Sequence, residues 1–364
     1  MSVIVLGGGL MGSATAFFLA RRGIAVTLIE TARIGAGATV ASFGNIRRSG
    51  RYLPQLPLAR RSLTLWNQAQ MLLDRDVEFR ATGHLRLIFD AEGLALMQAY
   101  AQAAHPWGLE LQELSPAQIR ERFPGLGPDA IAASFSPEDG SANPRLIVPA
   151  FAEAAARVGA QIVDQAQVGA IRPGFTVETS KGCFHADRVV NCTGHHGAAI
   201  AAAFGEPVPL TPCGPQMGVT EPLPHRIKPV VGVWSSTHGA YLRQVERGNI
   251  VFGGAVPRTP VGPDGLAHID PAHLPDQLRA VIRLAPALRH VSVIRQWSGA
   301  EGYVADELPV MGPSRTMPGL FHAFGFCGHG FQLGPGVGDA MAELVATGRC
   351  ETPLQDFDIG RFAE

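Results

Sequence analysis

The feature that most constrains this 364-residue chain is a glycine-rich turn near its N-terminus. Residues 7–12 read Gly-Gly-Gly-Leu-Met-Gly, which is the spacing G-x-G-x-x-G, between an apolar segment at 2–6 and a segment of helical apolar spacing at 10–22. A second apolar segment at 25–29 completes a β-α-β unit. In such a unit the first glycine permits a tight turn, the second admits a pyrophosphate, and the third lets helix and strand pack closely.

The residues around this turn predict a dinucleotide site. Free N–H groups at the start of helix 10–22 would face the phosphates. Glu30 ends the second strand at about the spacing of a ribose-binding acid, and its charge disfavours a 2′-phosphate. A glycine-rich turn without a ligand is the alternative. The motif alone does not choose between FAD and NAD.

Charge and cysteine usage argue against several other classes of protein. Lys and Arg (30) balance Asp and Glu (31), so no nucleic-acid partner is expected. The five cysteines include no C-x-x-C pair, which argues against a metal or iron–sulfur site in this chain and favours a reducing, cytoplasmic location. Every long apolar stretch is interrupted by Gly, Pro or charge, so we expect a soluble protein with no transmembrane segment.

The order of the expected elements predicts an α/β fold. The β-α-β unit is followed by a strand-rich middle, and the chain then returns to a strand, a Gly-rich loop and a helix. We therefore expect a Rossmann-like domain built from both chain ends, with an inserted, mostly antiparallel (α+β) lobe. Further helices are expected over 56–73, 91–104, 144–158, 274–285 and 336–347. The expected domains are 1–80, 140–205 and 295–364 for the cofactor, and 81–139 and 206–294 for the substrate or an interface.

Four further segments carry a resemblance to a known family. They are the small-residue loop 33–45, the strand end 189–194 (VVNCTG), the pair W-S-G at 297–299 with D-E-L-P-V-M-G at 306–312, and the loop 325–336 (GFCGHGFQLGPG). Together they resemble the D-amino-acid oxidase, glycine oxidase and sarcosine oxidase family of flavoproteins over nearly the whole chain. The resemblance implies FAD as the cofactor. A Gly-rich loop that opens a helix can aim N–H groups at the flavin and stabilise its reduced, negatively charged form.

The expected FAD-binding residues combine the nucleotide motif with this resemblance. Small residues after Glu30 let the backbone approach the phosphates and the flavin. His329 is expected to be structural within its loop, with contact to the flavin as the alternative. The full set is Gly7, Gly9, Leu10, Met11, Gly12, Glu30, Thr31, Arg33, Gly37, Ala38, Thr39, Ser42, Gly44, Asn45, Val168, Cys192, Thr193, Gly194, Gly328, His329, Gly330, Phe331 and Gln332.

Departures from the family pattern predict that FAD is bound non-covalently. In the monomeric sarcosine oxidases of this family, FAD is attached through a cysteine shortly after W-x-G. The matching residues of this chain, 301–305, contain no cysteine. Heterotetrameric sarcosine oxidase holds a covalent FMN through a histidine in the segment that matches 142–145, and no histidine occurs there. A covalent second flavin is therefore not expected either.

Two carboxylate anchors of the family are replaced in this chain. Relatives place a lysine at the position of Gln332 or an arginine at that of Glu301. The remaining candidates are Arg47, Arg48 and Arg51, in the loop expected to reach the flavin. Arg51 best matches the loop arginine that pairs with a substrate carboxylate, and Arg48 is a second candidate; a solvated basic turn is the alternative. Tyr241 is a candidate hydroxyl donor or a core residue. Glu301 is a candidate to receive a cation, to take the amine proton, or to pair structurally with an arginine.

Segments 45–58 and 82–85 resemble most the flavin (beta-type) subunits of heteromeric amino-acid dehydrogenases. These include opine oxidase, D-hydroxyproline dehydrogenase and cyanide-forming glycine dehydrogenase. The resemblance implies oxidation of the Cα–N bond of an amino or imino acid by hydride transfer to flavin, with hydrolysis of the imine product. It also implies sister subunits that carry a second nucleotide site and an iron–sulfur cluster. A non-catalytic or electron-relay FAD subunit and an NAD-dependent dehydrogenase remain as alternatives.

Overall fold

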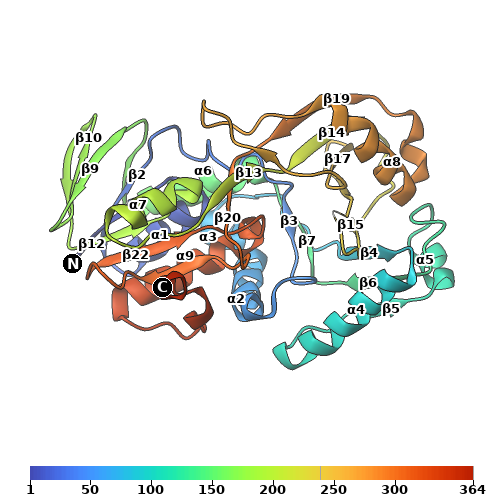
Figure 1. Cartoon of the computed structure of the whole chain (residues 1–364), viewed down its shortest axis with the longest axis horizontal. Coiled ribbons are helices and arrows are strands. Elements are labelled where there is room, and N and C mark those ends of the chain that lie inside the picture. The colour runs from blue at the N-terminus through green and yellow to red at the C-terminus, as the bar shows by residue number, and fades with distance from the viewer. Residues whose placement is uncertain (238, 364) are drawn as a thin grey trace.

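The computed structural model describes residues 1–237 and 239–363, which form two lobes side by side (Figure 1). The first lobe is built on a six-stranded sheet of order β21-β22-β12-β1-β2-β8. The second is built on an eight-stranded sheet of order β19-β14-β17-β16-β15-β4-β6-β5. The α/β class predicted from the sequence is confirmed.

The six-stranded sheet contains the β-α-β unit expected at the N-terminus. This unit comprises β1 (Ser2–Leu6), α1 (Leu10–Arg21) and β2 (Ala25–Ile29). β1 pairs in parallel with β2 and with β12 (Arg188–Asn191), and β12 pairs in parallel with β22 (Leu320–Phe324). Both ends of the chain therefore enter one sheet, whose central strands are buried and apolar as parallel sheets require.

Small residues allow the helices of this lobe to pack closely. α6 (Pro144–Arg157) and α9 (Gly330–Thr347) both pack against α1. A Cβ on Gly338 of α9 would lie only 2.4 Å from the Cβ of Ala14 in α1, so the two helix backbones nearly touch. The close contact brings the N-termini of α1 and α9 to the same side of the sheet.

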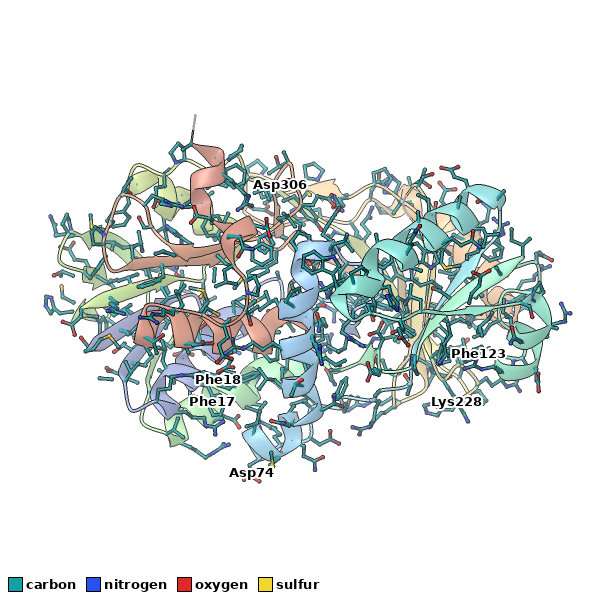
Figure 2. All side chains as sticks on the ribbon, turned by 90° about the horizontal axis from the view of Figure 1, so that it is seen from below. Phe17, Phe18, Asp74, Phe123, Lys228 and Asp306 are labelled. Atoms are coloured by element: carbon teal, nitrogen blue, oxygen red, sulfur yellow. The ribbon has the colours of Figure 1, made fainter. Side chains whose placement is uncertain are left out.

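The eight-stranded sheet joins two separate parts of the chain. β4 (His84–Ile88) pairs in parallel with β15 (Val230–Val233), whereas the other neighbours in this sheet are antiparallel. Figure 2 labels Phe17 in the core of the first lobe and Phe123 against the core of the second. The other strands of this sheet are β5 (Gln112–Leu114), β6 (Ala132–Ser136), β14 (Gln216–Pro222), β16 (Tyr241–Gln244), β17 (Asn249–Gly253) and β19 (Val293–Ser298).

The remaining elements surround the two sheets. A three-stranded sheet, β9 to β11, lies at the far end of the first lobe, and the pair β3–β7 and the sheet β18-β13-β20 lie between the lobes (Figure 1). The edge strands of the six-stranded sheet are β8 (Gln161–Val163) and β21 (Val310–Pro313). The strands outside the two large sheets are β3 (Asn45–Ile46), β7 (Gly140–Ser141), β9 (Val168–Arg172), β10 (Thr176–Thr179), β11 (Gly182–His185), β13 (Thr211–Gly214), β18 (Thr259–Pro260) and β20 (Glu301–Tyr303). The helices are α2 (Leu56–Asn67), α3 (Ala69–Leu73), α4 (Ala91–Ala104), α5 (Pro116–Arg122), α7 (Gly197–Ala203) and α8 (Leu274–Leu284).

The sequence boundaries of the two domains stay a prediction. The proposed division at 294/295 falls inside β19, which runs from Val293 to Ser298 and pairs with β14. Within the described residues, no helix combines the length and apolarity needed to cross a bilayer.

Candidate active site

The glycine turn between β1 and α1 forms an open cradle at a helix N-terminus. Gly7 has φ +97°, and a Cβ on Gly12 would lie 1.8 Å from the Gly7 oxygen, so the turn itself requires both glycines. A Cβ on Gly9 would meet only the Thr39 hydroxyl, at 3.7 Å. The N-cap residue of α1, Gly9, has no side chain that could cap the helix. The space in front of Gly9 and the N–H groups at the start of α1 together fit a pyrophosphate.

Glu30 ties the end of β2 to this cradle. Its carboxylate accepts hydrogen bonds from the N–H groups of Gly8 (2.6 Å) and Ala32 (2.7 Å). The Thr39 hydroxyl accepts one from the Leu10 N–H at 3.2 Å, which fastens the small-residue loop to the start of α1. The motif, the acid and the loop, predicted separately, therefore lie together.

A second helix N-terminus comes from the other end of the chain. α9 begins at Gly330, six residues before the expected start, so the Gly-His-Gly segment leads directly into its first turn. No side chain caps this helix either. The two helix N-termini fit the two halves of FAD, with phosphates at α1 and the flavin ring at α9.

The structure places the other expected FAD-binding residues unequally. Gln332 is buried, and its amide donates to the Ala59 carbonyl at 2.8 Å, so its side chain is committed to α2. Arg33 lies in a separate shallow groove beside α6. The expected residues that line the cavity described next are Ser42, Asn45, Gly328, His329, Phe331 and Gln332.

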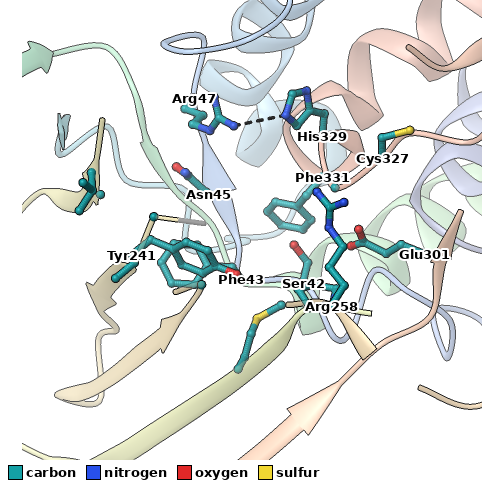
Figure 3. A pocket seen from close by; sticks show the side chains of 18 of the residues that line it. Ser42, Phe43, Asn45, Arg47, Tyr241, Arg258, Glu301, Cys327, His329 and Phe331 are labelled. Carbon is teal, nitrogen blue, oxygen red and sulfur yellow. Dashed lines mark hydrogen bonds between the residues drawn. The ribbon is translucent and has the colours of Figure 1, made fainter. Parts of the chain in front are cut away.

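A cavity of about 340 Å³ lies where the first lobe meets the eight-stranded sheet. Its lining comes from the segment after Ala41, from β4, β14, β15 and β16, from the segment after β17, from β20, and from the loop before α9 with the first turn of that helix. Figure 3 shows part of this lining, with Arg47 beside His329 and with Glu301 beside Arg258. Among the described residues, the Arg, Lys, Asp and Glu side chains that line it are Arg47, Arg51, Arg86, Arg258 and Glu301.

Arg51 is held rigidly in the cavity wall. It is 3% exposed, and it donates from Nε to the Arg47 carbonyl (2.7 Å) and from Nη1 to the His329 carbonyl (3.1 Å). Burial, together with the Arg47 charge, holds the pKa of Arg51 well below its usual value. Nη2 donates to none of the described residues, so it is free to bind an anion in the cavity.

Arg48 is placed differently from Arg51. Its side chain does not line the cavity but pairs with Glu138, and its backbone N–H donates to Asp139 at 2.8 Å. Arg47, the third arginine of this loop, lines the cavity instead.

His329 bridges the α9 loop to the arginine loop. Its ring nitrogens lie 2.9 Å from Gln55 Oε1 and 3.4 Å from Arg47 Nη2. Burial and the neighbouring arginines hold the pKa of His329 well below its usual value, so the ring is neutral near pH 7. A neutral imidazole is not repelled by the neighbouring arginines, whereas a protonated ring would be.

Tyr241 and Glu301 both line the cavity, as proposed from the sequence. Tyr241 packs edge-on against Phe43 at 4.6 Å, and burial raises its pKa. Glu301 accepts a hydrogen bond from the Tyr303 hydroxyl at 2.8 Å, and burial raises the pKa of Glu301. Arg258 lies over the Tyr303 ring at 3.9 Å. Glu301 is thus hydrogen-bonded to Tyr303 and also faces the cavity.

Comparison with known proteins identifies the family. The family model described as "DAO: FAD dependent oxidoreductase" matches residues 2–344. The chain belongs to this family of FAD-dependent oxidoreductases. It is 27% identical to sarcosine oxidase subunit beta of Rhodobacter capsulatus, over 100% of this chain and 88% of the relative.

Two solved structures share the fold of this FAD-dependent oxidoreductase. L-proline dehydrogenase from P. horikoshii superposes with a TM-score of 0.93 and 30% identity, over 99% of this chain and 97% of that one. Glycine oxidase from Geobacillus kaustophilus superposes with a TM-score of 0.90 and 24% identity, over 100% of this chain and 99% of that one.

Sequence reasoning missed three basic residues of the cavity in this oxidoreductase. His84 and Arg86 lie on β4, and Arg258 lies after β17. A signal for the first two existed, because they alternate with Leu85 and Leu87, which are fully buried in the second-lobe core. This alternation marks one face of the strand as polar. It does not reveal that the face lines a cavity.

Cysteine chemistry in this oxidoreductase supports non-covalent FAD. Cys327 lines the cavity, but burial raises its pKa to about 11, so the thiol stays protonated and is a poor nucleophile. Within residues 1–237 and 239–363, no group of three or more His, Cys, Asp or Glu side chains is arranged to hold a metal ion.

Proposed function

We propose that this enzyme oxidises the Cα–N bond of an amino or imino acid, of the secondary-amine or D-amino-acid type. The observation that carries the proposal is the cavity in front of α9, which presents guanidinium groups and one half-buried carboxylate to the same space. The printed names of its relatives concern sarcosine, proline and glycine, which are all amino or imino acids. A zwitterion of this kind needs a cation for its carboxylate and a polar group near its amine.

Arg51 is the proposed carboxylate anchor. Its free Nη2 can donate a charge-assisted hydrogen bond to an anion in the cavity. Because Arg51 is already fixed by two backbone carbonyls, little side-chain entropy is lost when the substrate binds. Such an anchor would fix the orientation of Cα in the cavity.

Glu301 is the proposed partner of the substrate amine. The amine must be neutral before its Cα–H bond can break towards an electron acceptor, and a carboxylate with a raised pKa is suited to take that proton. Bound FAD would accept the hydride from Cα. The resulting imine leaves the cavity and is hydrolysed by water.

The chain is also proposed to act within a larger assembly. The sarcosine oxidase relative is itself named as a subunit beta, which supports sister subunits as electron acceptors. Iron–sulfur and second-nucleotide subunits would then receive electrons from this FAD. In the rival proposal the FAD only relays electrons and the chain oxidises no amine.

Anaerobic reduction of the bound flavin tests the proposed function. The yellow holoprotein is mixed under anaerobic conditions with glycine, N-methylglycine, proline or D-amino acids. The flavin absorbance, at roughly 450 nm, is then followed. Bleaching by one of these supports amine oxidation. Flavin that dithionite reduces but no amino or imino acid reduces would favour the relay. A colourless protein active with NAD would overturn both.

A further inference from the structure

Two arginines from different lobes meet at the end of the cavity away from Glu301. Nη1 of Arg86 and Nη1 of Arg47 both lie within 3.3 Å of one point, the position that a Cβ on Gly50 would take. Figure 3 shows Arg47 on the His329 side, whereas Glu301 and Arg258 lie on the other side. The cavity is therefore divided into a purely cationic end and a mixed end.

Arg86 is held in place, but one of its donor atoms has no hydrogen-bond partner among the described residues. Its Nη2 donates to the Val233 carbonyl at 3.0 Å, and its guanidinium lies over the Trp234 ring at 3.6 Å. Nη1 is buried and has no hydrogen-bond partner among the described residues. Burial and the charge of Arg47 lower the pKa of Arg86 to about 9. An unpaired buried donor on a cation is costly unless a ligand completes it.

The cationic end has too little negative charge of its own. Asp139 is fully buried nearby, but it accepts hydrogen bonds from Ser49 Oγ (2.7 Å) and from the Arg48 N–H (2.8 Å), which fix the arginine loop. His84 is neutral because burial and the arginines hold its pKa well below the usual value. Arg47, Arg51 and Arg86 thus share one carboxylate. The α-carboxylate of a simple amino acid would balance only one of the two remaining charges.

Building on the proposed function, we propose that the substrate is an amine that carries two carboxylates. Arg51 binds the carboxylate attached to the reacting carbon, and Arg86 with Arg47 binds the second one. Each carboxylate would then neutralise one surplus cation in a buried, charge-assisted contact. Simple N-methyl amino acids lack the second group and leave Arg86 unpaired.

Unreactive ethers test this subsite without turnover. Diglycolate and methoxyacetate differ by one carboxylate, and their binding to the oxidised holoenzyme is measured by perturbation of the flavin spectrum. We expect diglycolate to bind at least roughly 30-fold tighter than methoxyacetate. Arg86→Met should reduce that ratio below about threefold and leave methoxyacetate binding unchanged, whereas the exposed Arg60→Met should change neither. Equal binding of the two ethers by wild type overturns the proposal, and so does equal weakening of both by Arg86→Met.

The amine pair separates this proposal from the proposed function. Iminodiacetate should reduce the flavin with a second-order rate constant at least roughly 30-fold above that of N-methylglycine. If diglycolate binds selectively but neither amine reduces the flavin, the subsite stands and amine oxidation fails. If N-methylglycine reduces it as efficiently as iminodiacetate, the subsite fails and amine oxidation stands. If Arg86→Met does not fold, Arg86→Lys and the wild-type comparison of the two ethers still decide.

Discussion

The nucleotide cradle and the charged cavity lie close together but are built from different parts of the chain's chemistry. The cradle consists mostly of backbone: the turn with Gly7, Gly9 and Gly12, and the N-termini of α1 and α9, with the Glu30 carboxylate accepting from the Gly8 N–H. The cavity consists of side chains that both lobes contribute. A backbone turn of this kind requires glycines at fixed spacing in one short segment, so the sequence reveals it. A cavity assembled from distant segments has no such local sequence motif.

The largest expected effect separates fold from binding within the cradle itself. Gly12→Val should abolish soluble folded protein, because its Cβ would lie 1.8 Å from the Gly7 oxygen and the neighbouring backbone cannot move. Gly9→Val should fold yet lose FAD, because its side chain would fill only the space proposed for the pyrophosphate. Far-UV circular dichroism and flavin content of the purified proteins measure the two effects. A yellow Gly9→Val protein with full flavin content would move the pyrophosphate elsewhere.

Much of the fold could be predicted because local patterns agreed with tertiary packing. The bounds expected at 2–6, 25–29 and 91–104 are those of β1, β2 and α4. The expected helix 56–73 is instead two helices, broken at Gln68. The last helix begins six residues early, because its first turns contain glycines and Pro335 that read as loop and are stabilised only by packing on α1 and α2.

The cavity could be predicted only in part. Arg51, Tyr241 and Glu301 were found through resemblance, and all three line it. Arg86 and Arg258 were missed because which side chains converge depends on how β4 and β17 meet the first lobe, and no short motif encodes that. The alternation on β4 could have marked Arg86 as polar-facing but not as a ligand.

Arg51 gives the largest effect expected in the cavity. Arg51→Gln should lower kcat/KM roughly 30- to 1,000-fold, through loss of about 2–4 kcal/mol of charge-assisted binding. Because its side chain lies in the cavity and not in the cradle, FAD content should stay normal. Arg48→Gln is the matched control from the same loop, since the Arg48 side chain pairs with Glu138 outside the cavity. Stopped-flow flavin reduction measures both. A larger effect at Arg48 would show that the loop moves on binding.

Glu301 tests whether the mixed end of the cavity handles a proton. Glu301→Gln keeps an acceptor for the Tyr303 hydroxyl but cannot take a proton, so flavin reduction at neutral pH should slow roughly 10- to 100-fold. The deficit should shrink as pH rises, because more substrate then arrives with a neutral amine. The pH profile of anaerobic reduction measures this. A deficit that is constant from pH 7 to 10 would assign Glu301 to positioning alone.

His84 gives the smallest effect, on stability and not on rate. It is 4% exposed, one of its ring nitrogens lies 3.1 Å from Ser49 Oγ, and burial with Arg86 and Arg47 holds its pKa well below the usual value. In the unfolded chain His84 takes up a proton as the pH falls through about 6.5, whereas in the folded protein it stays neutral. The contribution of this site to the unfolding free energy is therefore intact above that pH and is lost as the pH falls below it. Between pH 8 and pH 5 this site alone should cost up to about 2 kcal/mol of unfolding free energy. His84→Asn removes the titration, so its unfolding free energy, from urea titrations at each pH, should fall less on acidification than that of wild type. An offset between the two proteins at pH 8, where His84 is neutral in the folded and the unfolded chain, would reflect only the changed hydrogen bond to Ser49. Parallel pH profiles would mean that His84 is protonated in the folded state, and the cationic end of the cavity would then hold more negative charge than Asp139 supplies.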